Sequence, residues 1–133
     1  MGQNHTASKT VLIVDDYSDA RELLKLFLSA DGYNVAEASN GLEGVEAALL
    51  VHPDLIIMDI SMPVLDGLDA LRQIRRDDSL RDTPVLIITA HGKQGIDLYA
   101  DNAELLNENT EYLPKPIDLG LLKDALNRLV PQD

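Results

Sequence analysis

The chain has 133 residues, of which 45% are hydrophobic and 26% charged, and this balance excludes disordered and collagen-like proteins. Its 23 acidic and 11 basic residues give a formal net charge of -12, which argues against direct binding to nucleic acid. The absence of cysteine excludes disulfides and thiolate metal sites.

Both ends of the chain are predicted to be short tails around one folded domain. Residues 1–9 are polar and lack the apolar run of a secretory signal. No segment reaches the ~20 apolar residues needed to span a bilayer. We therefore predict a flexible N-terminal tail at residues 1–9, a folded domain at residues 10–130 and a C-terminal tail at residues 131–133. No membrane insertion and a cytoplasmic location are expected.

The first half of the domain predicts two strand–helix pairs. Strands are predicted at Thr10–Val14 and Tyr33–Glu37. The helix between them has apolar residues at helical spacing: Ala20, Leu23, Leu24, Phe27 and Leu28. Ser18 is the expected cap of this helix, and Gly32 lies just past its end. The second helix ends before Pro53 and is marked by Leu42, Val45, Ala48 and Leu49.

The second half predicts three more strands and three more helices. The strands are expected at Asp54–Asp59, Val85–Thr89 and Glu111–Leu113. A third helix begins near Gly67 and is marked by Leu68, Leu71 and Ile74. A fourth is marked by Ile96, Tyr99, Ala103 and Leu106. A fifth begins near Asp118, ends at Pro131 and is marked by Leu122, Ala125, Leu126 and Leu129.

Alternation of five strands and five helices predicts an α/β protein with a flavodoxin-like, doubly wound, five-stranded parallel sheet in the order 2-1-3-4-5. The strands Thr10–Val14, Asp54–Asp59 and Val85–Thr89 are continuous apolar runs, as central strands covered on both faces must be. Ligands of such sheets bind beyond the carboxyl ends of the strands, where the strand order reverses. The side chains at these ends are therefore the candidates for a site.

Five polar residues stand at these strand ends: Asp15, Asp16, Asp59, Thr89 and Lys115. We expect them to converge. Three neighbouring carboxylates repel one another unless a cation lies between them. Magnesium prefers oxygen ligands, and the pattern offers no imidazole or thiolate of the kind that zinc prefers. The sequence therefore predicts a site for Mg²⁺ (or Mn²⁺) with Asp15, Asp16 and Asp59 as ligands.

The same residues favour phosphoryl transfer. An aspartate can attack phosphorus and form an aspartyl phosphate when nearby cations neutralise the transferring group. Asp59 is the expected nucleophile. Lys115 is expected to pair with Asp59 at rest and with a phosphoryl oxygen after transfer, and Thr89 adds a hydroxyl donor.

Over Thr10 to Leu129 the chain resembles the receiver domain of two-component response regulators. The matching motifs are Val14 to Asp16, Asp59 with Ser61, Met62, Pro63 and Gly67, Thr89 with Ala90, and Tyr112 to Pro116. The resemblance implies the same phosphoacceptor, metal and phosphate-binding roles that the residues suggest. It also implies a main-chain metal ligand at Ser61, a cis peptide bond between Lys115 and Pro116, and a switch aromatic at Tyr112 that follows Thr89.

By this resemblance the chain is a single-domain response regulator. It would accept a phosphoryl group from a histidine kinase or phosphotransfer protein and change the face formed by the fourth helix, the fifth strand and the fifth helix. That face would regulate a downstream protein that the sequence does not identify. The expected protein is a monomer or weak dimer. It is not an enzyme, since it catalyses only its own phosphoryl transfer and aspartyl-phosphate hydrolysis.

Two stretches depart from the usual pattern of the family. The segment from Thr89 to Lys115 is about one helical turn longer than is common, and residues 107–110 stand where a Gly-Ala pair usually precedes the fifth strand. Both stretches lie on the expected output face. They leave the predicted chemistry intact and concern the partner.

Each site residue also has an ordinary structural explanation when taken alone. Asp15 and Asp16 could be a solvated turn, Lys115 a surface lysine and Tyr112 a packing residue. The convergence of five such residues favours the functional interpretation. The three histidines show no ligand spacing.

Other functions share parts of the pattern. A flavin carrier would need a small-residue phosphate cradle where Asp15 and Asp16 stand, and a nucleotide hydrolase would need a glycine-rich loop that is absent. A phosphatase with an aspartyl nucleophile commonly has a second acid where Ser61 stands. The alternative that remains open is a receiver-like protein-interaction module that works without phosphorylation.

Overall fold

The computed structural model describes residues 9–60, 66–89 and 108–131. The strands are β1 (Thr10–Val14), β2 (Asn34–Ala38), β3 (Leu55–Asp59), β4 (Val85–Thr89) and β5 (Thr110–Pro114). The helices within these ranges are α1 (Ser18–Ala30), α2 (Gly41–Val51), α3 (Asp66–Arg76) and α5 (Leu119–Leu129). None of these helices has both the length and the apolar composition needed to cross a membrane.

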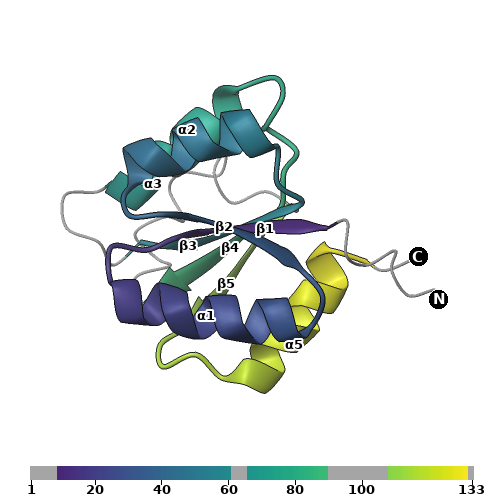
Figure 1. The fold of residues 1–133 in the computed structure, drawn as a ribbon. Coiled ribbons are helices and arrows are strands. Elements are labelled where there is room, and N and C mark those ends of the chain that lie inside the picture. The colour runs from purple at the N-terminus through teal and green to yellow at the C-terminus, as the bar shows by residue number, and fades with distance from the viewer. Residues whose placement is uncertain (1–8, 61–65, 90–107, 132–133) are drawn as a thin grey trace.

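The five strands form one parallel sheet in the order β2-β1-β3-β4-β5. This confirms the predicted doubly wound, flavodoxin-like fold and its strand order. Helices α1 and α5 cover one face of the sheet, and α2 and α3 cover the other (Figure 1). The fourth predicted helix, at residues 96–106, lies outside the described residues.

The sheet separates two layers of apolar core. One layer packs against the helices through Val45, Ala48, Ala70, Leu71 and Ile74. The other packs through Leu24, Leu28, Leu122, Ala125 and Leu126. Every residue of β3 and β4, and all of β1 after Thr10, is buried. The continuous apolar runs of the sequence therefore correspond to central strands, as predicted.

The beginning of α1 differs from the sequence prediction. Ser18 is the first helical residue and not the cap, which is Tyr17, and the Tyr17 side chain makes no capping hydrogen bond. The prediction was wrong because the side chain that caps the turn comes from Asp15, just after β1, and not from Ser18. Asp15 Oδ1 accepts a hydrogen bond of 2.9 Å from the Tyr17 amide. The turn thus depends on the carboxylate that precedes it.

The end of α1 shifts the start of β2 by one residue from the prediction. Gly32 adopts a positive φ of 95°, which a side chain would disfavour. The amide of Tyr33 then donates to the Leu28 carbonyl at 3.0 Å and completes the helix end. Since Tyr33 is used in this way, the strand begins at Asn34.

Helix α2 packs through small residues. Leu42 and Leu49, the two leucines that predict this helix, are 66% and 43% exposed. The buried residues are Gly41, Gly44, Val45 and Ala48. The helix begins at Asn40, whose Oδ1 accepts a hydrogen bond of 2.9 Å from the Glu43 amide. Its small inner face allows α2 to lie close to the sheet.

Candidate functional site

The ends of β1 and β3 bring the three predicted acidic residues together. Val14 pairs with Met58, so Asp15 and Asp59 follow at the same level on neighbouring strands. Oxygen atoms of Asp15, Asp16 and Asp59 all lie within 4.8 Å of one another. Asp15 and Asp59 are buried, whereas Asp16 is exposed. The cluster is therefore open to solvent on the side of Asp16.

Burial and repulsion disfavour the ionised form of Asp15. The pKa of Asp15 is raised above its ordinary value of 3.8, chiefly because burial disfavours the charged form, and Asp59 and Asp16 add repulsion. The Tyr17 amide and the charge of Lys115 oppose this effect. A hard divalent cation would relieve the repulsion. The donor set consists only of carboxylate oxygens, so it fits magnesium or manganese and does not resemble a zinc site.

The ends of β4 and β5 add a hydroxyl and an ammonium group. Thr89 is 1% exposed and closes β4. The Lys115 amide donates to the Thr89 carbonyl at 2.8 Å, which continues the ladder past the end of β5. The Lys115 Nζ donates to Asp59 Oδ2 at 2.8 Å. The peptide bond between Lys115 and Pro116 is cis. The lysine thus lies directly beside the acidic cluster.

Tyr112, a further predicted residue, stands apart from this cluster. Tyr112 belongs to β5, and 51% of it is exposed to solvent. Ser61, the expected main-chain ligand, lies outside the described residues. Of the predicted residues that the structure describes, the three acids and Lys115 therefore lie together, and Thr89 ends the strand beside them.

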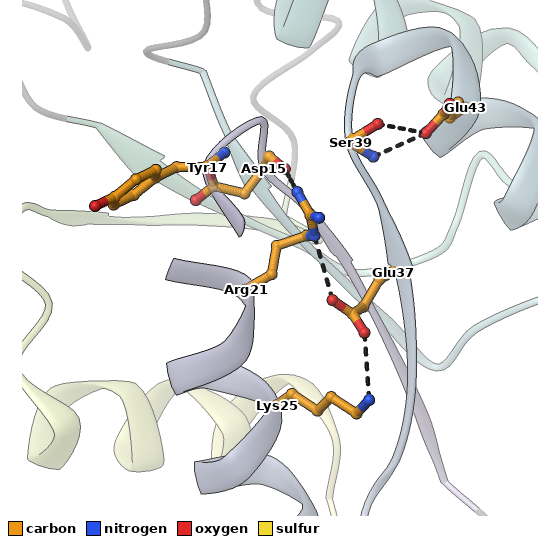
Figure 2. Close-up of polar contacts among 7 residues, drawn as sticks. All are labelled: Asp15, Tyr17, Arg21, Lys25, Glu37, Ser39 and Glu43. Atoms are coloured by element: carbon orange, nitrogen blue, oxygen red, sulfur yellow. Dashed lines mark hydrogen bonds and ion pairs between the residues drawn. The ribbon is translucent and has the colours of Figure 1, made fainter. Parts of the chain in front are cut away.

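Arg21 of α1 contacts the site and was missed by sequence reasoning. Its Nη1 donates to the Asp15 carbonyl at 2.7 Å, and its Nε donates to Glu37 Oε1 of β2 at 3.2 Å (Figure 2). Lys25 Nζ lies 3.5 Å from Glu37 Oε2. A signal was present in the sequence, because Arg21 falls on the same helical face as the buried Leu24. A charged residue on such a face needs a partner.

Arg75 of α3 is a second cation that sequence reasoning missed. It is 8% exposed. Its Nη1 donates to the carbonyls of Arg81 and Thr83 at 3.0 Å and 2.8 Å. Its Nη2 donates to the Asn109 carbonyl at 3.3 Å and to Thr110 Oγ1 at 2.6 Å. Arg75 thus joins the loop before β4 to the start of β5, at the opposite end of these strands from the acidic cluster.

A pocket of about 650 Å³ lies beside the acidic cluster. Asp15 and Lys115 form part of its wall. Most of the rest is apolar and comes from α1 and from the segment after β5, including Tyr17, Leu23, Leu24, Ile117 and Leu119. The pocket therefore offers apolar surface next to the charged groups.

The sequence matches a family model described as the response regulator receiver domain over residues 11–127. It is 36% identical over 114 residues to the DNA-binding dual master transcriptional regulator RpaA of Synechocystis, covering 82% of this chain and 44% of that protein. The chain spans about half the length of the curated relatives it matches.

Solved structures show the same similarity. The chemotaxis response regulator CheY4 of Vibrio cholerae is 28% identical with a TM-score of 0.79, over 92% of this chain and 98% of that chain. The response regulator TrrA of Thermotoga maritima, solved in complex with Mg²⁺-BeF, is 31% identical with a TM-score of 0.76, over 92% of this chain and 99% of that chain.

Proposed function

Since the chain belongs to the response regulator receiver domain family, we propose that it is a phosphorylation-activated signalling switch whose phosphoacceptor is Asp59. The observation that carries this proposal is the position of Asp59. Its carboxylate is buried at the end of β3, within 4.8 Å of the other two acids and 2.8 Å from the Lys115 ammonium. This arrangement supports a nucleophile whose charge is matched by cations.

In the proposed reaction, an Asp59 oxygen forms a bond to phosphorus while the phosphorus–nitrogen bond of a phosphohistidine donor breaks. Lys115 exchanges its contact with Asp59 for one with a phosphoryl oxygen, and Thr89 donates a hydrogen bond to another. Asp15, Asp16, Asp59 and the main-chain carbonyl of Ser61 would hold Mg²⁺ or Mn²⁺. The ion would supply positive charge to balance the transferring group.

Response regulators receive their phosphoryl group from histidine kinases, and we propose a histidine kinase or a phosphotransfer protein as the donor here. The apolar pocket between α1 and the segment after β5 supports this proposal, because it adjoins Asp15 and Lys115. A donor protein could dock there and still present its phosphohistidine to Asp59. We further propose that the chain acts on no other substrate and that it works in the cytoplasm as a monomer or weak dimer.

The output is proposed to pass through Tyr112. Its side chain is half exposed in the structure, so an inward movement that follows Thr89 would bury it and reshape the face formed by the fourth predicted helix, β5 and α5. The net charge of -12 favours a protein partner over direct contact with nucleic acid. A binding module without phosphorylation is the weaker alternative, because it gives the acidic cluster no role.

The test is phosphorylation of the 133-residue chain by acetyl phosphate, followed by intact mass and peptide mapping. We expect a single labile phosphoryl group, attached to Asp59 and formed only when Mg²⁺ or Mn²⁺ is present. Labelling on another residue, or no labelling by acetyl phosphate and a panel of histidine kinases, would contradict the proposal. Beryllofluoride with Mg²⁺ offers a stable substitute, since TrrA was solved with it. The NMR signals of the Tyr112 ring should then shift.

A further inference from the structure

The turn between β1 and α1 carries two of the three acids and is held at several points. The Asp15 amide donates to the Ala38 carbonyl of β2 at 3.1 Å. Asp15 Oδ1 accepts from the Tyr17 amide at 2.9 Å. The Asp15 carbonyl accepts from Arg21 Nη1 at 2.7 Å. The amide, carboxylate and carbonyl of one residue are therefore all engaged, and Arg21 makes the shortest of the three contacts.

Arg21 is itself held in place by β2. Its Nε donates to Glu37 Oε1 at 3.2 Å, while the other oxygen of Glu37 faces Lys25 Nζ at 3.5 Å (Figure 2). The Arg21 side chain is only 18% exposed and that of Glu37 is 33% exposed. A guanidinium group can serve two acceptors at once with its planar fork, whereas an ammonium group acts as a point charge. Arg21 therefore acts as a brace between β2 and the acidic turn.

The contact is to the main chain of Asp15 and not to its carboxylate. The charges that chiefly influence the pKa of Asp15 are those of Asp59, Lys115 and Asp16. The two hydrogen bonds of Arg21 go to the Asp15 carbonyl and to Glu37. What it can control is the path of the turn, and hence the distance at which Asp15 and Asp16 face Asp59.

We propose that Arg21 is a positioning residue for the acidic cluster. Braced by Glu37, it holds the Asp15 carbonyl and so keeps the β1–α1 turn in the conformation that binds a divalent cation. This inference rests on the proposed function, because it takes Asp15, Asp16 and Asp59 as the cation site. Groups that orient the ligands of a metal are commonly worth about 10- to 100-fold in affinity.

The test measures Mg²⁺ binding to the full chain by isothermal titration calorimetry, without a phosphodonor. Arg21→Gln removes the charge and the fork, and Arg21→Lys keeps the charge but removes the fork. Both should weaken Mg²⁺ binding by about tenfold or more. The matched control is Lys25→Gln, which removes the outer partner of Glu37 and touches nothing in the turn. This control should bind Mg²⁺ like the original chain.

Two further readouts separate positioning from a general loss of structure. Amide hydrogen exchange at Tyr17 should become faster in metal-free Arg21→Gln, because the turn that orients Asp15 Oδ1 is loosened. Phosphorylation by acetyl phosphate should need more Mg²⁺ to reach half its maximal rate. Its rate at saturating Mg²⁺ should stay unchanged, since Arg21 touches neither Asp59 nor Lys115. If the Arg21 variants unfold, Glu37→Gln provides the same comparison, and weaker Mg²⁺ binding is expected.

Each outcome bears on the inference. If the original chain binds Mg²⁺ but the Arg21 variants, or Glu37→Gln in their place, bind it equally well, the inference is overturned and the proposed function stands. Normal binding by Arg21→Lys beside weakened Arg21→Gln would mean that charge alone matters, and would also overturn it. If the original chain binds no Mg²⁺, or if Asp16→Asn binds it unchanged, the proposed function fails and takes the inference with it.

Discussion

Lys115 Nζ donates a hydrogen bond of 2.8 Å to Asp59 Oδ2, although the two residues are 56 positions apart in the chain. The contact joins the ends of β3 and β5, which are separated in the sheet by β4. It places a cation against a carboxylate that is 4% exposed. Lys115 is much more exposed than its partner, and in the proposed reaction it would exchange this contact for one with a phosphoryl oxygen.

Replacing Asp59 by Asn should abolish phosphorylation by acetyl phosphate, because an amide oxygen does not provide the nucleophilic carboxylate. The change is nearly isosteric, so the fold should be retained. Intact mass spectrometry after incubation with acetyl phosphate and Mg²⁺ measures the result. The matched control is Asp78→Asn, at a side chain that is 97% exposed and outside the site. Equal labelling of the two variants would remove Asp59 from its proposed role.

Replacing Lys115 by Gln should slow phosphorylation by roughly 10²- to 10³-fold, the usual effect of removing one donor that stabilises charge in a transition state. The initial rate with acetyl phosphate at saturating Mg²⁺ is the quantity to compare. Lys123→Gln serves as the control, since Lys123 pairs with Asp31 on the surface at 3.2 Å. A rate for Lys115→Gln that equals the control rate would show that the 2.8 Å contact has no catalytic role.

Replacing Asp15 by Asn should stabilise the metal-free fold at neutral pH. The pKa of Asp15 in the folded protein is raised above its unfolded value of 3.8. Protonation of Asp15 therefore stabilises the fold. This stabilisation is fully present below pH 3.8 and is lost as the pH rises through the pKa of the folded protein. At pH 7 the carboxylate is ionised and destabilising, whereas the amide never ionises. Urea unfolding in EDTA from pH 7 down to about pH 4 should show an advantage that shrinks with acid. The exposed Asp78→Asn change is the control, and lower stability of Asp15→Asn at pH 7 would contradict the reasoning.

Replacing Arg75 by Ala should lower the free energy of unfolding by about 3 kcal/mol, because it removes four part-buried hydrogen bonds, to the carbonyls of Arg81, Thr83 and Asn109 and to the Thr110 hydroxyl. Urea denaturation of the whole chain measures this loss. Arg72→Ala is the comparison, since Arg72 pairs with Asp69 on the surface at 3.2 Å and should contribute less than about 1 kcal/mol. Similar losses in both variants would mean that the four hydrogen bonds of Arg75 add little.

Replacing Gly44 by Ala should destabilise the protein despite the better helix propensity of alanine. A Cβ at this position would lie 2.9 Å and 3.1 Å from the two methyl groups of Val14, a stiff and fully buried side chain. Overpacking of this kind typically costs 1–3 kcal/mol, against a propensity gain of about 1 kcal/mol. Thermal unfolding should show a lower midpoint. Glu46→Ala, at an exposed position of the same helix, is the control. A higher midpoint for Gly44→Ala would show that α2 can move away from β1.

Much of the fold was accessible from local patterns. The strands Thr10–Val14 and Val85–Thr89 have the predicted bounds, and the other three differ from the prediction by one residue at one end or at both. Errors arose where a residue had a partner that the local pattern does not reveal. Ser18 looks like a cap, but the Asp15 carboxylate holds the turn through the Tyr17 amide. Leu42 looks like a core residue, but it is exposed, and the inner face of α2 is formed by two glycines with Val45 and Ala48.

For the candidate site, the sequence by itself determined which chemical groups stand at the strand ends, because residue type and the apolar period of the strands are local properties. Only the tertiary structure decided which of these groups touch. The Lys115–Asp59 contact depends on the register of three strands, and the contacts of Arg21 and Arg75 depend on how each helix packs against the sheet. A long side chain can reach many positions in an unfolded chain. Packing selects the few acceptors that it meets, and no spacing in the sequence encodes that choice.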